Sequence, residues 1–189
     1  MPGHHTEYAF ETVIEQYLTS AGGYAAGDRE AFDPARALFP AEVISFIQQT
    51  QPKEWEYLCN IQPDQAAATL LDELGRALGS EHEGCLAVLR HGFKCYGKLF
   101  RVAFFAPASG LNPEIQALYV ANRLTITRQV RYSNLHSNTL DIVLALNGLP
   151  IATLELKNHL TGQTWQNAKR QYQYDRDPKD LIFQFRKRA

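Results

Sequence analysis

Two short apolar segments joined by a strong turn signal constrain the fold of this chain more than any other feature. Residues 140–146 and 151–156 are rich in aliphatic and β-branched side chains, and Asn147 and Gly148 lie between them. An Asn-Gly pair between two such runs predicts an antiparallel β-hairpin. Residues 142–146 are apolar throughout, which is typical of a central strand covered by helices on both faces. We therefore expect a buried sheet built around this hairpin.

Three charged side chains interrupt the hairpin where core packing would favour apolar residues. Asp141 begins the first strand, and Glu155 and Lys157 lie near the end of the second. Buried charges are costly unless they are paired or bound to a metal. Because side chains alternate along a strand, Glu155 and Lys157 share one face. A loop at 147–149 would place Asp141 opposite Glu155, where Cβ atoms lie about 4.5–5.5 Å apart.

The expected register, with Leu146 paired to Pro150, brings two carboxylates close enough to share one cation. Mg²⁺ takes oxygen ligands, needs few carboxylates and accepts a substrate phosphate as a further ligand. The Leu156 carbonyl is a candidate additional ligand, and Lys157 could orient or deprotonate a water or neutralise developing charge. The trio predicts metal-dependent phosphodiester hydrolysis. A salt-bridged network at a sheet edge is the structural alternative, and spacing alone leaves it open.

The remaining pattern predicts an α/β fold, with a mixed central sheet flanked by helices and an N-terminal helical segment. A helix over 7–19 carries an apolar stripe, formed by Phe10, Val13, Ile14, Tyr17 and Leu18. Proline and glycine bound further elements: helices at 40–51, 63–79, 84–91 and 163–174, and strands at 99–105, 123–130 and 181–185. With 189 residues, one compact domain is expected, divided into a helical segment at 1–83 and a core at 84–189.

The segment 137–158, which contains the Asp141 and Glu-x-Lys motifs, resembles the nuclease core of the R subunit of type I restriction enzymes. That core is a branch of the PD-(D/E)XK nucleases. The similarity extends to Arg-Gln-Val-Arg-Tyr-Ser at 128–133, Thr-Gly-Gln at 161–163, Gln-Tyr at 171–172 and Asp-Arg-Asp-Pro at 175–178. It is specific over roughly residues 84–189 and thinner before them. Leu140 stands where the family motif has proline.

This resemblance implies a restriction-endonuclease-like fold in which Asp141 and Glu155 bind Mg²⁺ and Lys157 is catalytic. It also implies a first-helix glutamate near the site, for which Glu11 is the candidate and Glu7 and Glu15 are competitors. The family tends to carry a Gln-x-x-x-Tyr element after the Glu-x-Lys strand. Gln171 and Tyr172 are the candidates for it, although Asp175 occupies the position four residues after Gln171.

The net charge of −1 hides an asymmetry along the chain. Residues 1–120 carry 8 Lys and Arg against 15 Asp and Glu, whereas residues 121–189 carry 11 against 5. Positive charge of this kind suits a polyanion, and arginine and lysine supply most sequence-independent contacts to DNA phosphates. The candidates for such contacts are Arg128, Arg131, Lys169, Arg170 and Arg176.

The resemblance implies double-stranded DNA as substrate and the methyltransferase and specificity subunits of a restriction complex as partners. It also implies that the chain is an N-terminal fragment of a longer protein whose motor domains use ATP. The alternative is a catalytically inactive module of the same fold that docks DNA or another subunit. The three cysteines are irregularly spaced and no apolar run could span a bilayer, so a cytoplasmic protein without a membrane partner is expected.

Overall fold

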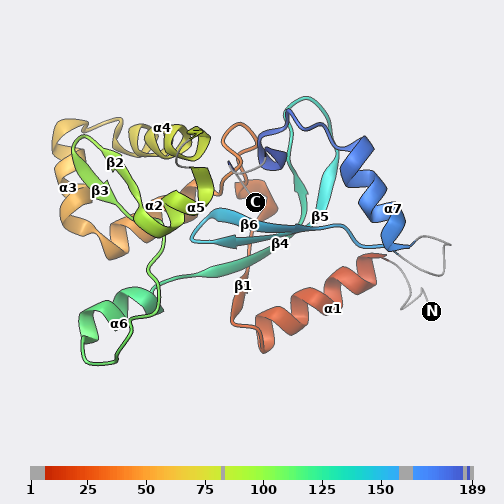
Figure 1. The fold of residues 1–189 in the computed structure, drawn as a ribbon, viewed down its shortest axis with the longest axis horizontal. Coiled ribbons are helices and arrows are strands. Elements are labelled where there is room, and N and C mark those ends of the chain that lie inside the picture. The colour runs from red at the N-terminus through yellow and green to blue at the C-terminus, as the bar shows by residue number, and fades with distance from the viewer. Residues whose placement is uncertain (1–6, 82–83, 158–163, 185–186, 188–189) are drawn as a thin grey trace.

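The structure is a computed structural model that describes residues 7–81, 84–157, 164–184 and 187. The bounds of its helices and strands are α1 Glu7–Ser20, β1 Tyr24–Ala26, α2 Pro40–Thr50, α3 Pro52–Ile61, α4 Ala66–Gly79, α5 Gly84–His91, β2 Phe93–Cys95, β3 Lys98–Phe100, α6 Pro113–Val120, β4 Leu124–Arg131, β5 Thr139–Leu146, β6 Leu149–Leu154 and α7 Trp165–Arg170. Most of the helices come first in the chain, and the long strands β4–β6 follow them, with α7 after the last strand (Figure 1). No helix of these described parts is long and apolar enough to cross a membrane.

The central sheet has four strands in the order β1-β4-β5-β6, which confirms the predicted mixed sheet. β1 runs parallel to β4, and the other neighbours are antiparallel. α1 lies along the sheet on one side and α7 lies at the end of the sheet farthest from α2–α5 (Figure 1). The sequence pattern missed β1, because a three-residue strand is too short to show an alternation.

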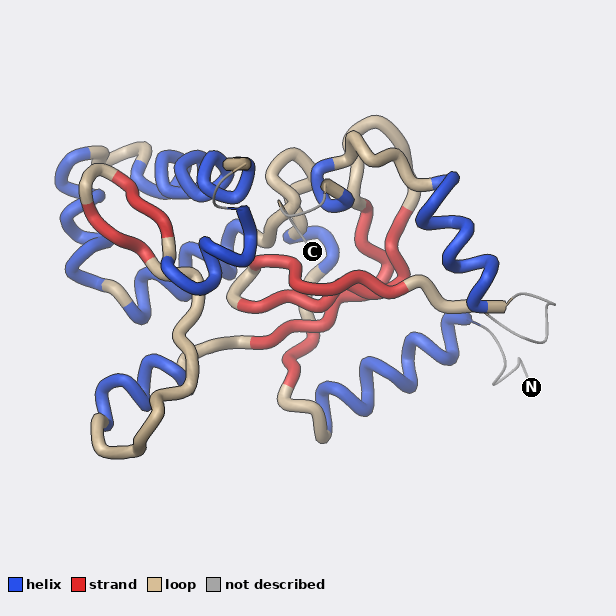
Figure 2. The backbone as a smooth tube through the Cα atoms, in the orientation of Figure 1, coloured by secondary structure: helices blue, strands red, loops and turns tan. Residues whose placement is uncertain are grey.

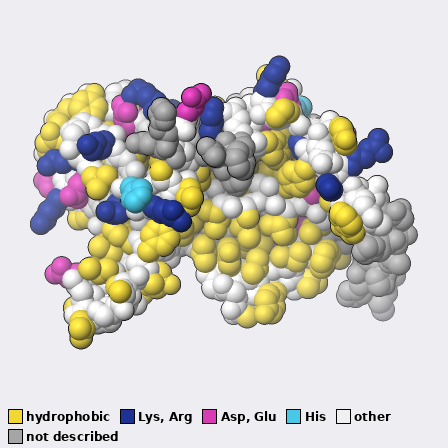
Figure 3. All heavy atoms as spheres, viewed as in Figure 1, with side chains coloured by type: hydrophobic (Ala, Val, Ile, Leu, Met, Phe, Trp, Pro, Cys, Tyr) yellow, Lys and Arg dark blue, Asp and Glu magenta, His cyan; other side chains and the backbone are white. Residues whose placement is uncertain are grey.

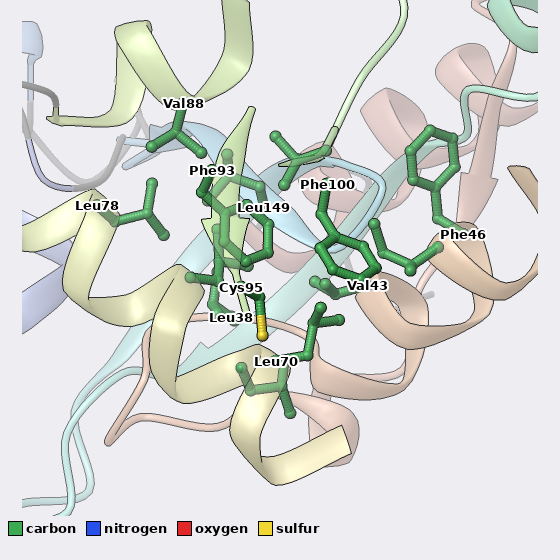
Figure 4. Close-up of a cluster of buried hydrophobic side chains, with 14 of the residues drawn as sticks. Leu38, Val43, Phe46, Leu70, Leu78, Val88, Phe93, Cys95, Phe100 and Leu149 are labelled. Atoms are coloured by element: carbon green, nitrogen blue, oxygen red, sulfur yellow. The ribbon is translucent and has the colours of Figure 1, made fainter. Parts of the chain in front are cut away.

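Apolar side chains form separate clusters on either side of this arrangement. The largest is built from α2–α5 and the small β2–β3 hairpin, and Leu149 of β6 reaches into it (Figure 4). A second cluster joins Phe39 to Val130, Leu140 and Val143 of the sheet. The third packs Ile142 against α1. The hairpin β5–β6 therefore contributes to every core, as its apolar sequence predicts.

The turn of the β5–β6 hairpin differs from the predicted one, but the strands have the predicted register at the end of the hairpin away from the turn. Leu146 pairs with Leu149 rather than Pro150, across a two-residue turn in which Asn147 and Gly148 have φ values of 52° and 84°. A β-bulge then inserts Ile151, and beyond it Ile142 pairs with Leu154. The bulge restores the offset that the sequence analysis assumed for Asp141 and Glu155.

The predicted apolar stripe of α1 is wrong. Phe10, Val13 and Tyr17 are 52 %, 58 % and 67 % exposed, whereas Glu11 is 2 % exposed. Ile14 and Leu18 alone of the predicted stripe pack against the sheet. The helix is turned so that a carboxylate faces inward, and hydrophobic side chains cover much of the surface where α1 lies (Figure 3).

Three other predicted elements differ from the structure. Of the strand expected at 99–105, only residues 99 and 100 are in a strand, as the end of β3, and residues 101–105 form no regular element. The sequence pattern missed β2 and the turn at Tyr96 and Gly97 that joins it to β3. The strand expected at 181–185 is a 3₁₀ turn at Leu181–Phe183. The helix expected from 163 begins at Trp165 and continues from Arg170 into a π-helical turn at Gln171–Asp175.

Candidate active site

Asp141 lies on β5 at the point where the pairing with β6 ends. Its Oδ2 atom accepts a hydrogen bond of 2.6 Å from the backbone N–H of Leu156. Its Oδ1 atom lies 3.5 Å from Nε2 of Gln129. The backbone bond joins Asp141 directly to the strand extension that carries Glu155 and Lys157, as the predicted register requires.

Glu155 is a buried carboxylate with two cationic neighbours. Its side chain is 2 % exposed, and its Oε1 atom forms an ion pair with Nη2 of Arg176. Its Oε2 atom lies 4.0 Å from Nζ of Lys157, whose side chain is 14 % exposed. The predicted Glu-x-Lys pair thus shares one face, and Arg176 is an additional member that sequence reasoning had assigned to DNA.

Arg176 links Glu155 to the neighbouring strands. Its Nη1 atom donates to the hydroxyl of Tyr132 at 2.8 Å, and its Nη2 atom donates to the carbonyl of Thr139 at 3.1 Å. The guanidinium also lies 5.0 Å from the centroid of the Tyr132 ring. Since an arginine fork has several fixed donors, one side chain can hold three acceptors in place.

Glu11 is the buried glutamate of α1, and its role in the site remains a prediction. Its Oε2 atom accepts from Nε of Arg128 at 3.1 Å, and its Oε1 atom accepts from Nε2 of Gln129 at 2.7 Å. Glu15 also pairs with Arg128. Burial lowers the pKa of Arg128, but its bonds to Glu15 and Glu11 outweigh this and hold the pKa above its ordinary value.

Tyr172 lies beside the site, whereas Gln171 is a half-buried residue at the start of the π-helical turn. The Tyr172 hydroxyl donates to Oγ1 of Thr153 on β6 at 2.9 Å. Burial raises the pKa of Tyr172, its hydrogen bond with Thr153 lowers it, and the charge of Asp141 raises it further. The structure therefore brings Tyr172 within electrostatic reach of Asp141. The Thr161–Gln163 motif lies outside the described residues.

The five candidates for DNA contact occupy different environments. Arg128 and Arg176 are engaged with carboxylates, and Arg131 donates to the carbonyls of Ser133 and His136. Lys169 and Arg170 are exposed at the end of α7. A role in DNA binding remains a prediction for all five.

Asp141 and Glu155 are the acidic side chains of this site that could hold a hard divalent cation. Asp141 and Glu155 supply carboxylate oxygens from neighbouring strands, and Oδ1 of Asp141 accepts no backbone hydrogen bond among the described residues. Within those residues no group of three or more His, Cys, Asp and Glu gathers to hold a metal. A site of two carboxylates suits Mg²⁺, which retains several waters. A bound ion would share Glu155 with Arg176.

Sequence reasoning missed the polar side chains that support these carboxylates. The side-chain NH₂ group of Gln129 contacts Glu11 and Asp141. The Thr139 hydroxyl donates to the side-chain Oε1 of Gln129 at 2.9 Å. The signal was present, because Arg128 and Gln129 are large polar residues within a strand whose interior is otherwise β-branched. Their partners could not be identified, since both contacts with Glu11 span more than a hundred residues of sequence.

The sequence matches a known protein family. The family model for the type I restriction enzyme R protein N terminus matches residues 6–187. The chain therefore belongs to this family, which confirms the resemblance noted from its motifs. Searches of curated proteins and of solved structures found no significant match.

Proposed function

We propose that this member of the R protein N-terminal family is the Mg²⁺-dependent endonuclease domain of a type I restriction enzyme, hydrolysing phosphodiester bonds of double-stranded DNA. The observation that carries the proposal is the grouping of Asp141, Glu155 and Lys157 where β5 begins and β6 ends. Family membership supports the restriction system as context. The methyltransferase and specificity subunits are the proposed partners, and ATP would serve only motor domains of the parent protein.

The carboxylates would hold the ion and the lysine would act beside it. When bound, Mg²⁺ lowers the pKa of a coordinated water and stabilises charge on the scissile phosphate. Asp141 is held in place by the Leu156 N–H, so its orientation needs little adjustment when it binds a ligand. Lys157, 4.0 Å from Glu155, would hold the attacking water or neutralise charge developing on phosphate oxygen.

The test is Mn²⁺ binding by calorimetry to the wild-type chain and to its Asp141→Asn and Glu155→Gln variants. Both substitutions keep the size of the side chain while removing its charge. We expect binding by the wild type and a loss of more than about 100-fold in affinity in each variant, because removing a metal ligand costs more than removing a hydrogen-bond partner of a ligand, which typically costs about 10–100-fold. Glu30→Gln, at an exposed carboxylate, is the control.

Cleavage is then measured on DNA with the complete restriction complex carrying the same variants. Loss of cleavage with retained DNA binding supports the nuclease. A wild-type chain that is folded and binds no Mn²⁺ with or without DNA would instead favour the docking module. In that function the Arg176–Glu155 ion pair would be a permanent structural link rather than part of a metal site.

A further inference from the structure

Gln129 has a backbone conformation that is unusual for its place in the fold. Its φ angle is 52°, in the left-handed region, although it lies inside β4. The residues on either side pair normally, Arg128 with Ile142 and Val130 with Leu140, so no residue is inserted. A non-glycine residue in this region is strained unless the surrounding contacts maintain it, and such strain concentrates at functional sites.

The left-handed residue coincides with a change in which face of the sheet each side chain occupies. Ile142 packs in the cluster with α1, whereas Leu140, two residues away, packs with Phe39 in the other cluster. Strict alternation would have placed both on one face. β4 and β5 bend along their length (Figure 2). Gln129 and Asp141 therefore lie where the two strands turn from one layer to the other.

The side-chain amide of Gln129 is oriented by its partners. Its carbonyl oxygen accepts from the Thr139 hydroxyl at 2.9 Å, so its NH₂ group faces the two carboxylates. Nε2 lies 2.7 Å from Oε1 of Glu11 and 3.5 Å from Oδ1 of Asp141. An NH₂ group has two hydrogens and can serve both acceptors, whereas a carboxylate at this position would repel both.

We propose that Gln129 is a positioning residue that fixes the Asp141 carboxylate relative to Glu11. Its left-handed backbone conformation directs the side-chain amide into the space between these two carboxylates. Asp141 is then held at both oxygens, by Leu156 and by Gln129. This inference rests on the proposed function, because the orientation of Asp141 matters for a metal ligand. It gives a role to the second residue of the Arg-Gln-Val-Arg-Tyr-Ser motif at 128–133.

The decisive variant is Gln129→Gly, because glycine adopts a positive φ without strain and removes only the side chain. We expect the affinity for Mn²⁺ to fall about 10–100-fold, the usual effect of losing a partner of a metal ligand, while the unfolding midpoint stays within a few degrees of the wild type. Gln129→Asn keeps an amide and tolerates the left-handed region but is one methylene too short, so it should also bind Mn²⁺ more weakly. Tyr96→Gly, at a left-handed residue of the β2–β3 turn, is the matched control and should bind Mn²⁺ as the wild type does.

A second readout needs no metal. NMR of the Gln129 side-chain amide should show slow hydrogen exchange in the wild type and faster exchange in Asp141→Ala and Glu11→Ala. Equal Mn²⁺ affinities in the wild type and Gln129→Gly, or an amide that exchanges as in an unstructured peptide, would overturn the positioning role. If the folded wild-type chain binds no Mn²⁺ in the presence or in the absence of DNA, that result refutes the proposed function itself and does not depend on the Gln129 variants.

Discussion

At the scale of single residues, Arg176 neutralises a carboxylate that the fold has buried. The side chains of Arg176 and Glu155 are 5 % and 2 % exposed, so both ions have lost most of their water. A buried pair gives little net stability compared with apolar residues, but removing one partner leaves an uncompensated charge. Lys157, at 4.0 Å, is too far to replace the lost bonds without moving.

Replacing Arg176 should therefore be costly, and the cost should depend on Glu155. We expect Arg176→Met to lower the free energy of unfolding by about 3–5 kcal/mol, measured by urea denaturation. The double variant with Glu155→Gln should recover a large part of that loss. Arg76→Met, which breaks an ion pair whose arginine is 71 % exposed, is the control and should cost less than about 1 kcal/mol. A similar loss in the single and double variants would contradict the pairing.

Tyr172 gives a prediction for alkaline pH. Its pKa is raised above the ordinary value of 10.0 by burial and by Asp141. A group with a raised pKa in the folded state contributes stability that is complete below its unfolded pKa and is lost as pH rises through the folded pKa. Tyr172→Phe should therefore lose less stability than the wild type between pH 9 and pH 11, in urea denaturation at each pH. At pH 7 the variant should be about 0.5–1.5 kcal/mol less stable, because the bond to Thr153 is lost. Parallel curves for both proteins would exclude a raised pKa.

At the scale of elements, the two hairpins provide a matched pair of turns. Gly148 and Gly97 have φ values of 84° and 77°, and each follows a residue that is also left-handed. A Cβ atom at Gly148 would lie 2.6 Å from the Phe39 carbonyl oxygen and 2.8 Å from the Val43 nitrogen, whereas one at Gly97 would meet nothing within 4 Å. The first turn is packed against α2, and the second is free of neighbours at that point.

Alanine at these glycines should separate backbone strain from close packing. Gly97→Ala should cost only the strain of a left-handed alanine, about 1–2 kcal/mol. Gly148→Ala should cost this amount plus about 1–3 kcal/mol for overpacking. The measurement is the free energy of unfolding from urea titrations of both variants. Equal losses would show that the contact with α2 can relax.

Some of these elements could be predicted from sequence patterns and others could not. The β5–β6 hairpin and its carboxylates could be predicted, because turn chemistry and strand alternation are local. The inward face of α1 could not, since its orientation depends on Glu11 meeting Arg128 and Gln129 from a strand far along the sequence. The bulge at Ile151 was also invisible, although it preserved the predicted position of Asp141. The burial of Arg176 was not predicted, because an arginine close to a proline in the sequence gives no sign of burial.

At the scale of the whole molecule, the division into 1–83 and 84–189 does not follow the packing of the cores. Leu149 of β6 lies in the cluster formed by α2–α5. Asn147, 2 % exposed, donates to the Val102 carbonyl and to Oδ1 of Asn122, both at 2.9 Å, and its own Oδ1 accepts from the Arg123 N–H at 2.7 Å. The turn of the central hairpin is thus bonded to the segment that leads out of the helical layer. We expect the helical layer and the sheet to unfold together.

Native-state hydrogen exchange tests this coupling through Asn147→Gly, which keeps the left-handed turn and removes the buried amide. Each partner left without a hydrogen bond costs about 1–3 kcal/mol. If the molecule is one cooperative unit, the slowest amides of α4 and of β5 should share one opening free energy in the wild type, and both should fall by the same amount in the variant. Asn112→Gly, at the exposed N-cap of α6, is the control and should affect only that helix. A decrease confined to α4 or to β5 would mean that the helical layer and the sheet open independently, because the hydrogen bonds of Asn147 would then stabilise only one of them.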